Sequence, residues 1–165
     1  MITQIRIKQL LNYNPSTGIF TWISKGHPRC NIKIGAIAGS RRRDGYVAIS
    51  IDKRPYLAHR LAWLYMTGEW PKSLIDHKNL DCSDNRLENL RASTFSQNGF
   101  NRKANKNNLI GLKGVCRERR TLAFYAQISI KGKRIHLGTF DCPAAAHLSY
   151  VVAADKFHGE FARAE

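Results

Sequence analysis

The chain has 165 residues, 43% of them hydrophobic, which allows one ordinary domain or two very small ones with a limited core. Lysine and arginine number 27 against 12 aspartate and glutamate residues, giving a formal net charge of +15. Such an excess repels itself unless a polyanion compensates it, so the charge predicts a nucleic-acid partner. The sequence has neither an apolar run long enough to span a bilayer nor a basic amphipathic helix with a bulky apolar face, which argues against a membrane partner.

The N-terminal sequence and the cysteines both favour an intracellular protein. Residues 1–18 hold a short apolar stretch without a small-residue cleavage site, so we expect no signal peptide and a cytoplasmic location. The cysteines are too far apart for a zinc knuckle or ribbon. We expect free thiols and no structural zinc, although the sequence alone leaves a disulfide open; the cysteines are Cys30, Cys82, Cys116 and Cys142.

The charge is unevenly distributed along the chain. Residues 1–70 carry 11 basic and 3 acidic side chains, residues 104–165 carry 10 and 5, and residues 71–103 carry only 6 and 4. The nearly balanced middle suits a site that needs carboxylate and amide ligands for a cation. The basic regions on either side suit surfaces that hold phosphates.

The first region predicts two helices and two strands. Apolar residues recur at helical spacing over 2–11, and a dense turn signal follows at 14–18. Residues 19–23 are aromatic and β-branched, and residues 45–51 alternate with period two, so both segments predict strands. A second helix is expected over 57–66.

Two basic segments outside these elements are candidate DNA contacts. One is a charged hairpin tip before the strand at 45–51. The other is the stretch 101–108, which is too polar to form a core and predicts a linker. Their side chains are expected to hold phosphates; the candidates are Arg41, Arg42, Arg43, Arg102 and Lys103.

The middle of the chain is the most informative part. A short strand from residue 74, a polar loop, a returning strand at 90–92 and a helix over 93–101 follow one another. Because consecutive residues of a strand point to opposite faces, we expect Asp76 and His77 at a strand end where the pleat breaks.

This region resembles the HNH endonuclease motif of the ββα-metal nucleases, particularly those of phages and homing endonucleases. The matching residues are Asp76 and His77, then Asn89 twelve residues after the histidine, then Asn98 nine residues further on. The string Asp-Asn-Arg-x-Glu-Asn-Leu at 84–90 matches as well. The resemblance implies a metal-dependent endonuclease that hydrolyses phosphodiester bonds of double-stranded DNA.

Phosphodiester hydrolysis needs a base for the attacking water and a cation for the departing sugar oxygen. His77 can accept the proton, since an unperturbed histidine has a pKa of roughly 6.5. Asp76 and Asn98 offer hard oxygen ligands that suit Mg²⁺, Mn²⁺ or another divalent cation. The resemblance implies this division of labour, and it implies that Asn89 orients the loop or strand carrying His77. For His59 we favour a core role over a phosphate contact.

After the linker, strand-like runs at 111–117, 123–130 and 133–140 precede an alanine-rich helix over 143–157. This unit resembles the DNA-binding domain of the plant APETALA and ethylene-response-factor family, in which a three-stranded sheet lies in the major groove. The resemblance implies contacts from each strand, with arginine suited to guanine and lysine to phosphate. The candidates are Arg117, Arg119, Phe124, Gln127, Lys133, Arg134 and His136.

We therefore predict an α+β fold with four segments. Residues 1–73 form a supporting strand and helix region, 74–103 the ββα-metal motif, 104–110 a linker, and 111–165 a three-stranded antiparallel sheet packed on one helix. The expected protein is a phage-encoded monomer or weak homodimer in the cytoplasm of a bacterial host.

Two alternatives stay open at this point. One is a DNA-binding regulator that keeps the nuclease fold without its activity, although the complete set of four motif residues argues against it. A basic RNA-binding or ribosome-associated protein would need only the charge. The recognition sequence, and the choice between nicking and double-strand cleavage, are not encoded in any motif.

Overall fold

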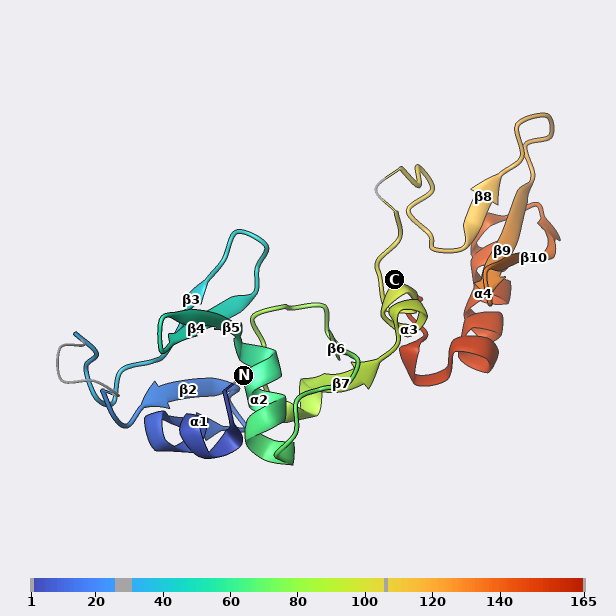
Figure 1. Ribbon diagram of the computed structural model, residues 1–165. Helices are drawn as coiled ribbons and strands as arrows, with labels where there is room; N and C mark the ends of the chain where they lie inside the picture. The colour runs from blue at the N-terminus through green and yellow to red at the C-terminus, as the bar shows by residue number, and fades with distance from the viewer. Residues whose placement is uncertain (1, 26–30, 106, 165) are drawn as a thin grey trace. The chain divides into compact units, whose positions relative to one another are not determined.

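The computed structural model describes residues 2–25, 31–105 and 107–164, and the chain forms two compact units, 1–94 and 95–165 (Figure 1). Helices are mixed with small antiparallel sheets, so the predicted α+β class is confirmed. The division falls inside the predicted nuclease segment, because the helix that ends this segment packs in the second unit. The four-segment organisation stays a prediction.

The first unit begins with a helix that runs directly into a hairpin. Helix α1 (Gln4–Leu10) is capped at its N-terminus by the hydroxyl of Thr3. Strand β1 (Leu11–Asn14), which was not predicted, follows without a break and pairs with β2 (Ile19–Trp22) across the predicted turn. Gly18, at φ +71°, closes the turn.

A second antiparallel sheet follows. It contains β3 (Ser40–Arg41), β4 (Val47–Ile51) and β5 (Arg54–Leu57) in that order. The predicted charged tip joins β3 to β4. Helix α2 (Ala58–Thr67) starts where β5 ends and stops at Gly68, which has a left-handed backbone with φ +83°.

The predicted strand pair of the middle region is confirmed. Strand β6 (Leu74–His77) pairs with β7 (Leu90–Ser93), which a short 3₁₀ turn, η1 (Leu87–Asn89), precedes. Helix α3 (Phe95–Phe100) is shorter than predicted. Ser93, the expected N-cap, is instead the buried last residue of β7.

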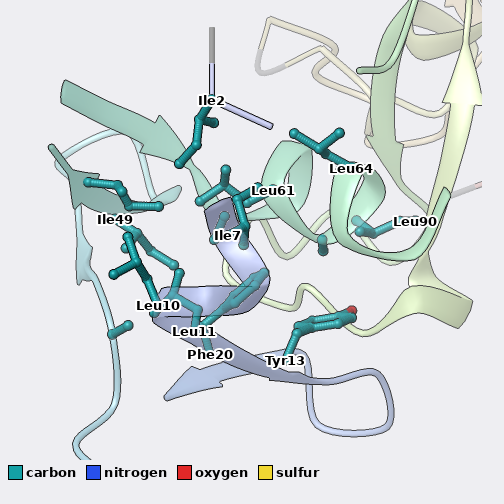
Figure 2. Packing of buried hydrophobic residues seen from close by; sticks show 14 of the residues in the cluster. Ile2, Ile7, Leu10, Leu11, Tyr13, Phe20, Ile49, Leu61, Leu64 and Leu90 are labelled. Carbon is teal, nitrogen blue, oxygen red and sulfur yellow. The ribbon is translucent and has the colours of Figure 1, made fainter. Parts of the chain in front are cut away.

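The core of the first unit is built from the apolar sides of α1, β1, β2, β4 and α2, with one residue from each strand of the β6–β7 pair. Ile7 of α1 and Leu61 of α2 are fully buried against each other's helices (Figure 2). Burying one such side chain stabilises the fold by about 1.5 to 3 kcal/mol. The β6–β7 pair is therefore anchored to this core through Ile75 and Leu90.

The second unit contains a three-stranded antiparallel sheet and a long helix, as predicted. The strands β8 (Val115–Arg117), β9 (Phe124–Ile130) and β10 (Lys133–Phe140) lie in the order β10-β9-β8. Helix α4 (Pro143–His158) begins at its proline and leads into a 3₁₀ turn, η2 (Gly159–Phe161).

One face of this sheet packs on α4. Ala126 and Ile128 of β9 are buried with Ala146 and Tyr150 of the helix. Gly114 lies under the ring of Tyr150, and an added Cβ there would come within 2.0 Å of it, so only glycine fits.

Three of the cysteines lie within the described residues. Cys82, Cys116 and Cys142 are free thiols, while Cys30 lies outside the described residues. Within the part of the chain that the structure describes, no helix is long and apolar enough to cross a membrane.

Candidate active site

The β6–β7 pair carries the first two residues of the motif. In its register Asp76 faces Arg91 and His77 faces Leu90. Asp76 and His77 are each only 4% exposed, and β6 ends at His77 as predicted. The register is unbroken through both residues, so the break in the pleat expected at Asp76 and His77 is absent, and the two side chains alternate as on a regular strand. The backbone first departs from the strand after them, in the turn where Leu80 has φ +66°.

Two rings and an amide surround the imidazole of His77. The ring of His59 meets it edge-on with centroids 5.0 Å apart, and the ring of Tyr46 lies 5.9 Å away. Nε2 of His77 is 3.4 Å from Oδ1 of Asn85. Burial lowers the pKa of His77, while Asn85 and the carboxylate of Asp76 oppose that shift. The imidazole is therefore mostly neutral near pH 7 and can accept a proton.

His59 is a buried histidine of α2, 5% exposed, which agrees with the core role favoured from sequence. Burial, with smaller contributions from His77 and Arg60, lowers the pKa of His59 to about 3. Its Nδ1 has no hydrogen-bond partner among the described residues. The contact between His59 and His77 was not predicted.

Asn89 binds together the loop that follows His77. Its Oδ1 accepts a hydrogen bond from the backbone N–H of Asn79 at 3.0 Å, and its Nδ2 donates to the carbonyl of Asp84 at 2.8 Å. Its own carbonyl accepts from the N–H of Lys78 at 2.9 Å. This geometry suits a residue that orients the loop next to His77.

A second set of bonds fixes the far side of the same loop. Arg86 donates to both carboxylate oxygens of Asp84, at 2.9 and 2.8 Å, and Asn79 donates to one of them at 2.7 Å. The bonds from Arg86 are the largest cause of the lowered pKa of Asp84, about 2. The loop therefore has an internal frame of charged hydrogen bonds.

Asp76 is paired with Arg91 of the neighbouring strand. The guanidinium donates to Oδ2 from Nε at 2.9 Å and lies 2.8 Å from it through Nη2, with both side chains largely buried. This pairing fixes the orientation of the Asp76 carboxylate, which is the hard oxygen donor predicted as a cation ligand. Among the described residues no group of three or more histidine, cysteine or acidic side chains is arranged to hold a metal. The carboxylate of Asp76 is a hard oxygen donor, and Mg²⁺ keeps most of its water ligands and needs only one or two such donors from a protein.

Asn98, the other predicted metal ligand, lies half-buried on α3. It belongs to the second unit, whereas Asp76, His77 and Asn89 are brought together in the first. The role of Asn98 as a ligand stays a prediction.

Residues 56–100 match the HNH endonuclease family. The matched range includes α2, the β6–β7 pair and α3, so the predicted HNH motif is confirmed and supports a nuclease that acts on DNA. The chain is also 28% identical over 106 residues to Protein 3.8 of Escherichia phage T7, which covers 64% of this chain and 87% of that protein. This relative is consistent with a phage origin. The likeness of residues 111–165 to the APETALA and ethylene-response-factor domain stays a prediction.

The basic residues predicted outside the HNH strands are exposed. Arg41, Arg42 and Arg43 form the tip between β3 and β4, where Arg42 pairs with Asp44 at 3.1 Å. Exposed side chains in the second unit complete this set: Arg102, Lys103 and Arg119. Exposed arginines are available to phosphates, and a surface pair such as that of Arg42 is easily exchanged.

The open face of the three-stranded sheet presents part of the predicted DNA surface. Gln127 lies opposite His136, and Ser129 lies opposite Arg134. These positions alternate along β9 with residues buried against α4, so they point away from the helix. Gln127, Arg134 and His136 therefore share the face of the sheet that α4 does not cover, and their contacts with DNA stay a prediction.

Phe124 is a correction, because it packs on the α4 side of the sheet. Arg117 lies opposite it in the register, with its guanidinium 6.0 Å from the centre of the Phe124 ring. Lys133 lies opposite Ile130, which packs against the core, so Lys133 is also on the α4 side of the sheet. Period-two alternation gives the open position to Tyr125, whose ring lies 5.8 Å from that of His136.

Sequence reasoning missed several residues around His77. Asn85 lies inside the matched string at 84–90, so the match itself marked it as a candidate site residue, although its contact with His77 is seen only in the structure. Arg91 follows from the register once the strand pair is predicted, because it lies opposite Asp76. Tyr46 carries no signal in its own segment.

Proposed function

We propose that this chain is a DNA endonuclease that hydrolyses phosphodiester bonds with the help of a divalent cation and with His77 as general base. The observation that carries the proposal is the buried His77 at the end of β6, next to Asp76 and followed by a loop framed by hydrogen bonds, within a range that matches the HNH family. Burial disfavours the protonated imidazole, which keeps its lone pair available at neutral pH.

The residues of the chain have distinct tasks in this mechanism. His77 takes the proton of the attacking water, and Asn85 fixes the plane of its ring through Nε2. Asn89 acts as a positioning residue, because it holds the loop after His77. Asp76 and Asn98 would hold the cation, which when bound stabilises charge on the phosphate and the departing oxygen.

DNA would be held by the exposed basic residues. We assign the open face with Gln127, Arg134 and His136 to groove contacts, and the tip with Arg41 and Arg43 to phosphates. These positions would supply DNA affinity and sequence specificity, while the HNH segment would supply the catalytic residues. The enzyme would act as a monomer or weak homodimer in the cytoplasm of a bacterial host.

Incubation of the purified chain with supercoiled plasmid and with its phage or bacterial genomic DNA tests the proposal. Cleavage in Mg²⁺ or Mn²⁺ that stops on addition of a chelator is expected, and the ratio of nicked to linear product reports single-strand or double-strand cutting. Tight DNA binding without cleavage in any divalent cation would instead favour an inactive regulator. Preference for RNA over DNA in competition would favour an RNA-binding protein.

A further inference from the structure

The turn between β1 and β2 packs directly on the loop that follows the proposed base, His77. Gly18 in this turn has φ +71°, and a Cβ added to it would lie 2.4 Å from the backbone nitrogen of Arg86 and 2.5 Å from the carbonyl carbon of Asn85. Both neighbours are backbone atoms, which cannot swing aside as the end of a long side chain can. Any residue other than glycine must therefore move the loop or the turn.

Two hydrogen bonds join the same surfaces. The hydroxyl of Tyr13 donates to the carbonyl of Asn85 at 2.7 Å, and the N–H of Leu87 donates to the carbonyl of Pro15 at 3.1 Å. Tyr13 is 4% exposed and packs on Phe20 with ring centres 4.6 Å apart. Figure 2 shows it at the edge of the core cluster, with its hydroxyl directed away from the labelled aliphatic residues. The loop is thus tied to the buried hydrophobic core of the first unit.

Asn85 connects this contact to the chemistry. Its carbonyl is held by Tyr13, and its side-chain oxygen lies 3.4 Å from Nε2 of His77. A shift of the Asn85 backbone therefore moves the group that orients the imidazole. We infer that the turn 14–18, through Gly18 and Tyr13, is a positioning element that sets the orientation of His77.

This inference rests on the proposed function, and a pair of glycine variants tests it. Gly18→Ala is compared with Gly35→Ala, because Gly35 has a similar φ of +83° but nothing within 4 Å of an added Cβ. Both variants carry the same kind of backbone strain, and only the first touches the loop. The melting temperature of each variant is measured first. DNA affinity and the single-turnover cleavage rate at saturating enzyme are then measured at a temperature at which both variants are folded.

Gly18→Ala is expected to lower the cleavage rate on the order of 100-fold while DNA affinity stays at the wild-type value, since a small misplacement of a catalytic group has an effect of that size. Gly35→Ala should keep the wild-type rate. Equal rates in the two variants would overturn the inference.

A second pair avoids the steric change. Tyr13→Phe removes only the hydroxyl bonded to Asn85, and Tyr65→Phe removes a hydroxyl from a neighbouring ring, 5.7 Å from Tyr13. The imidazole nitrogen resonances of His77, followed by NMR without DNA, should move in Tyr13→Phe and Gly18→Ala but not in Tyr65→Phe. This result does not depend on cleavage, so failure of the nuclease proposal would leave it intact. Unchanged His77 resonances in both Tyr13→Phe and Gly18→Ala would refute the positioning role.

Discussion

Nε2 of His77 lies 3.4 Å from Oδ1 of Asn85, and both side chains are almost fully buried. The side-chain amide of Asn85 is held in turn, because its Nδ2 donates to the carbonyl of Ser83 at 3.1 Å. The orientation of the imidazole therefore depends on the loop between the HNH strands as well as on the strand that carries it.

Asn85→Ala should lower the cleavage rate by roughly ten- to a hundredfold without weakening DNA binding, because the imidazole loses its orienting partner. Single-turnover kinetics and a binding titration on the same DNA separate the two effects. Asn12→Ala, at an exposed position of β1, is the control and should match wild type. A parallel loss of affinity and rate in Asn85→Ala would indicate a structural residue instead.

Arg91→Ala should lower the free energy of unfolding by about 3 to 5 kcal/mol, since it leaves the buried carboxylate of Asp76 without its countercharge. The matched control is Arg6→Ala, which breaks the exposed pair with Asp52 and should cost less than about 1 kcal/mol. Urea denaturation without added divalent cation measures both. Equal losses would show that burial of the Asp76 pair has no energetic consequence.

The hydrogen bonds of Asp84 in the loop between β6 and β7 predict that the free energy of unfolding falls at acidic pH. Because Arg86 lowers the pKa of Asp84 to about 2, ionised Asp84 stabilises the fold fully above its unfolded pKa of about 4. That stabilisation is lost as the pH falls from about 4 towards about 2. The difference in unfolding free energy between wild type and Asp84→Asn should shrink over this window. A difference that is constant from pH 6 to pH 2 would contradict the assignment.

The two faces of the second unit's sheet should behave differently towards DNA. Arg134→Ala, on the open face, should weaken binding and reduce the slope of log affinity against log salt by about one, if it holds a phosphate. Arg117→Ala, on the side of Phe124, should have a smaller effect on both. The opposite ranking in a salt titration would place DNA on the other face.

Most of the secondary structure could be predicted from local patterns, and the exceptions have physical causes. Strand β5 was missed because Pro55 cannot donate to a ladder, but β5 is an edge strand, where proline is tolerated. Ser93 resembled an N-cap, yet the pairing of Leu74 with Ser93 extends β7 over it. In both cases a neighbouring strand overrode a local preference.

The site was predictable as far as spacing along one segment allowed. The spacing of Asp76, His77 and Asn89 needs no tertiary information. The rings of Tyr46 and His59 reach His77 from a hairpin and a helix far away in the sequence, and only the folded first unit brings them together. The prediction that the Phe124 side chain faces DNA was wrong, because the resemblance predicts the strand but not which of its two faces α4 covers.

The rate at which the His77→Ala variant cleaves DNA tests most directly the claim that His77 is the general base. Single-turnover cleavage of plasmid DNA in Mg²⁺ and the DNA dissociation constant are compared between this variant and wild type. The account predicts at least about a hundredfold loss of rate with unchanged affinity, the size expected for a missing general base. Cleavage at the wild-type rate by His77→Ala would contradict it.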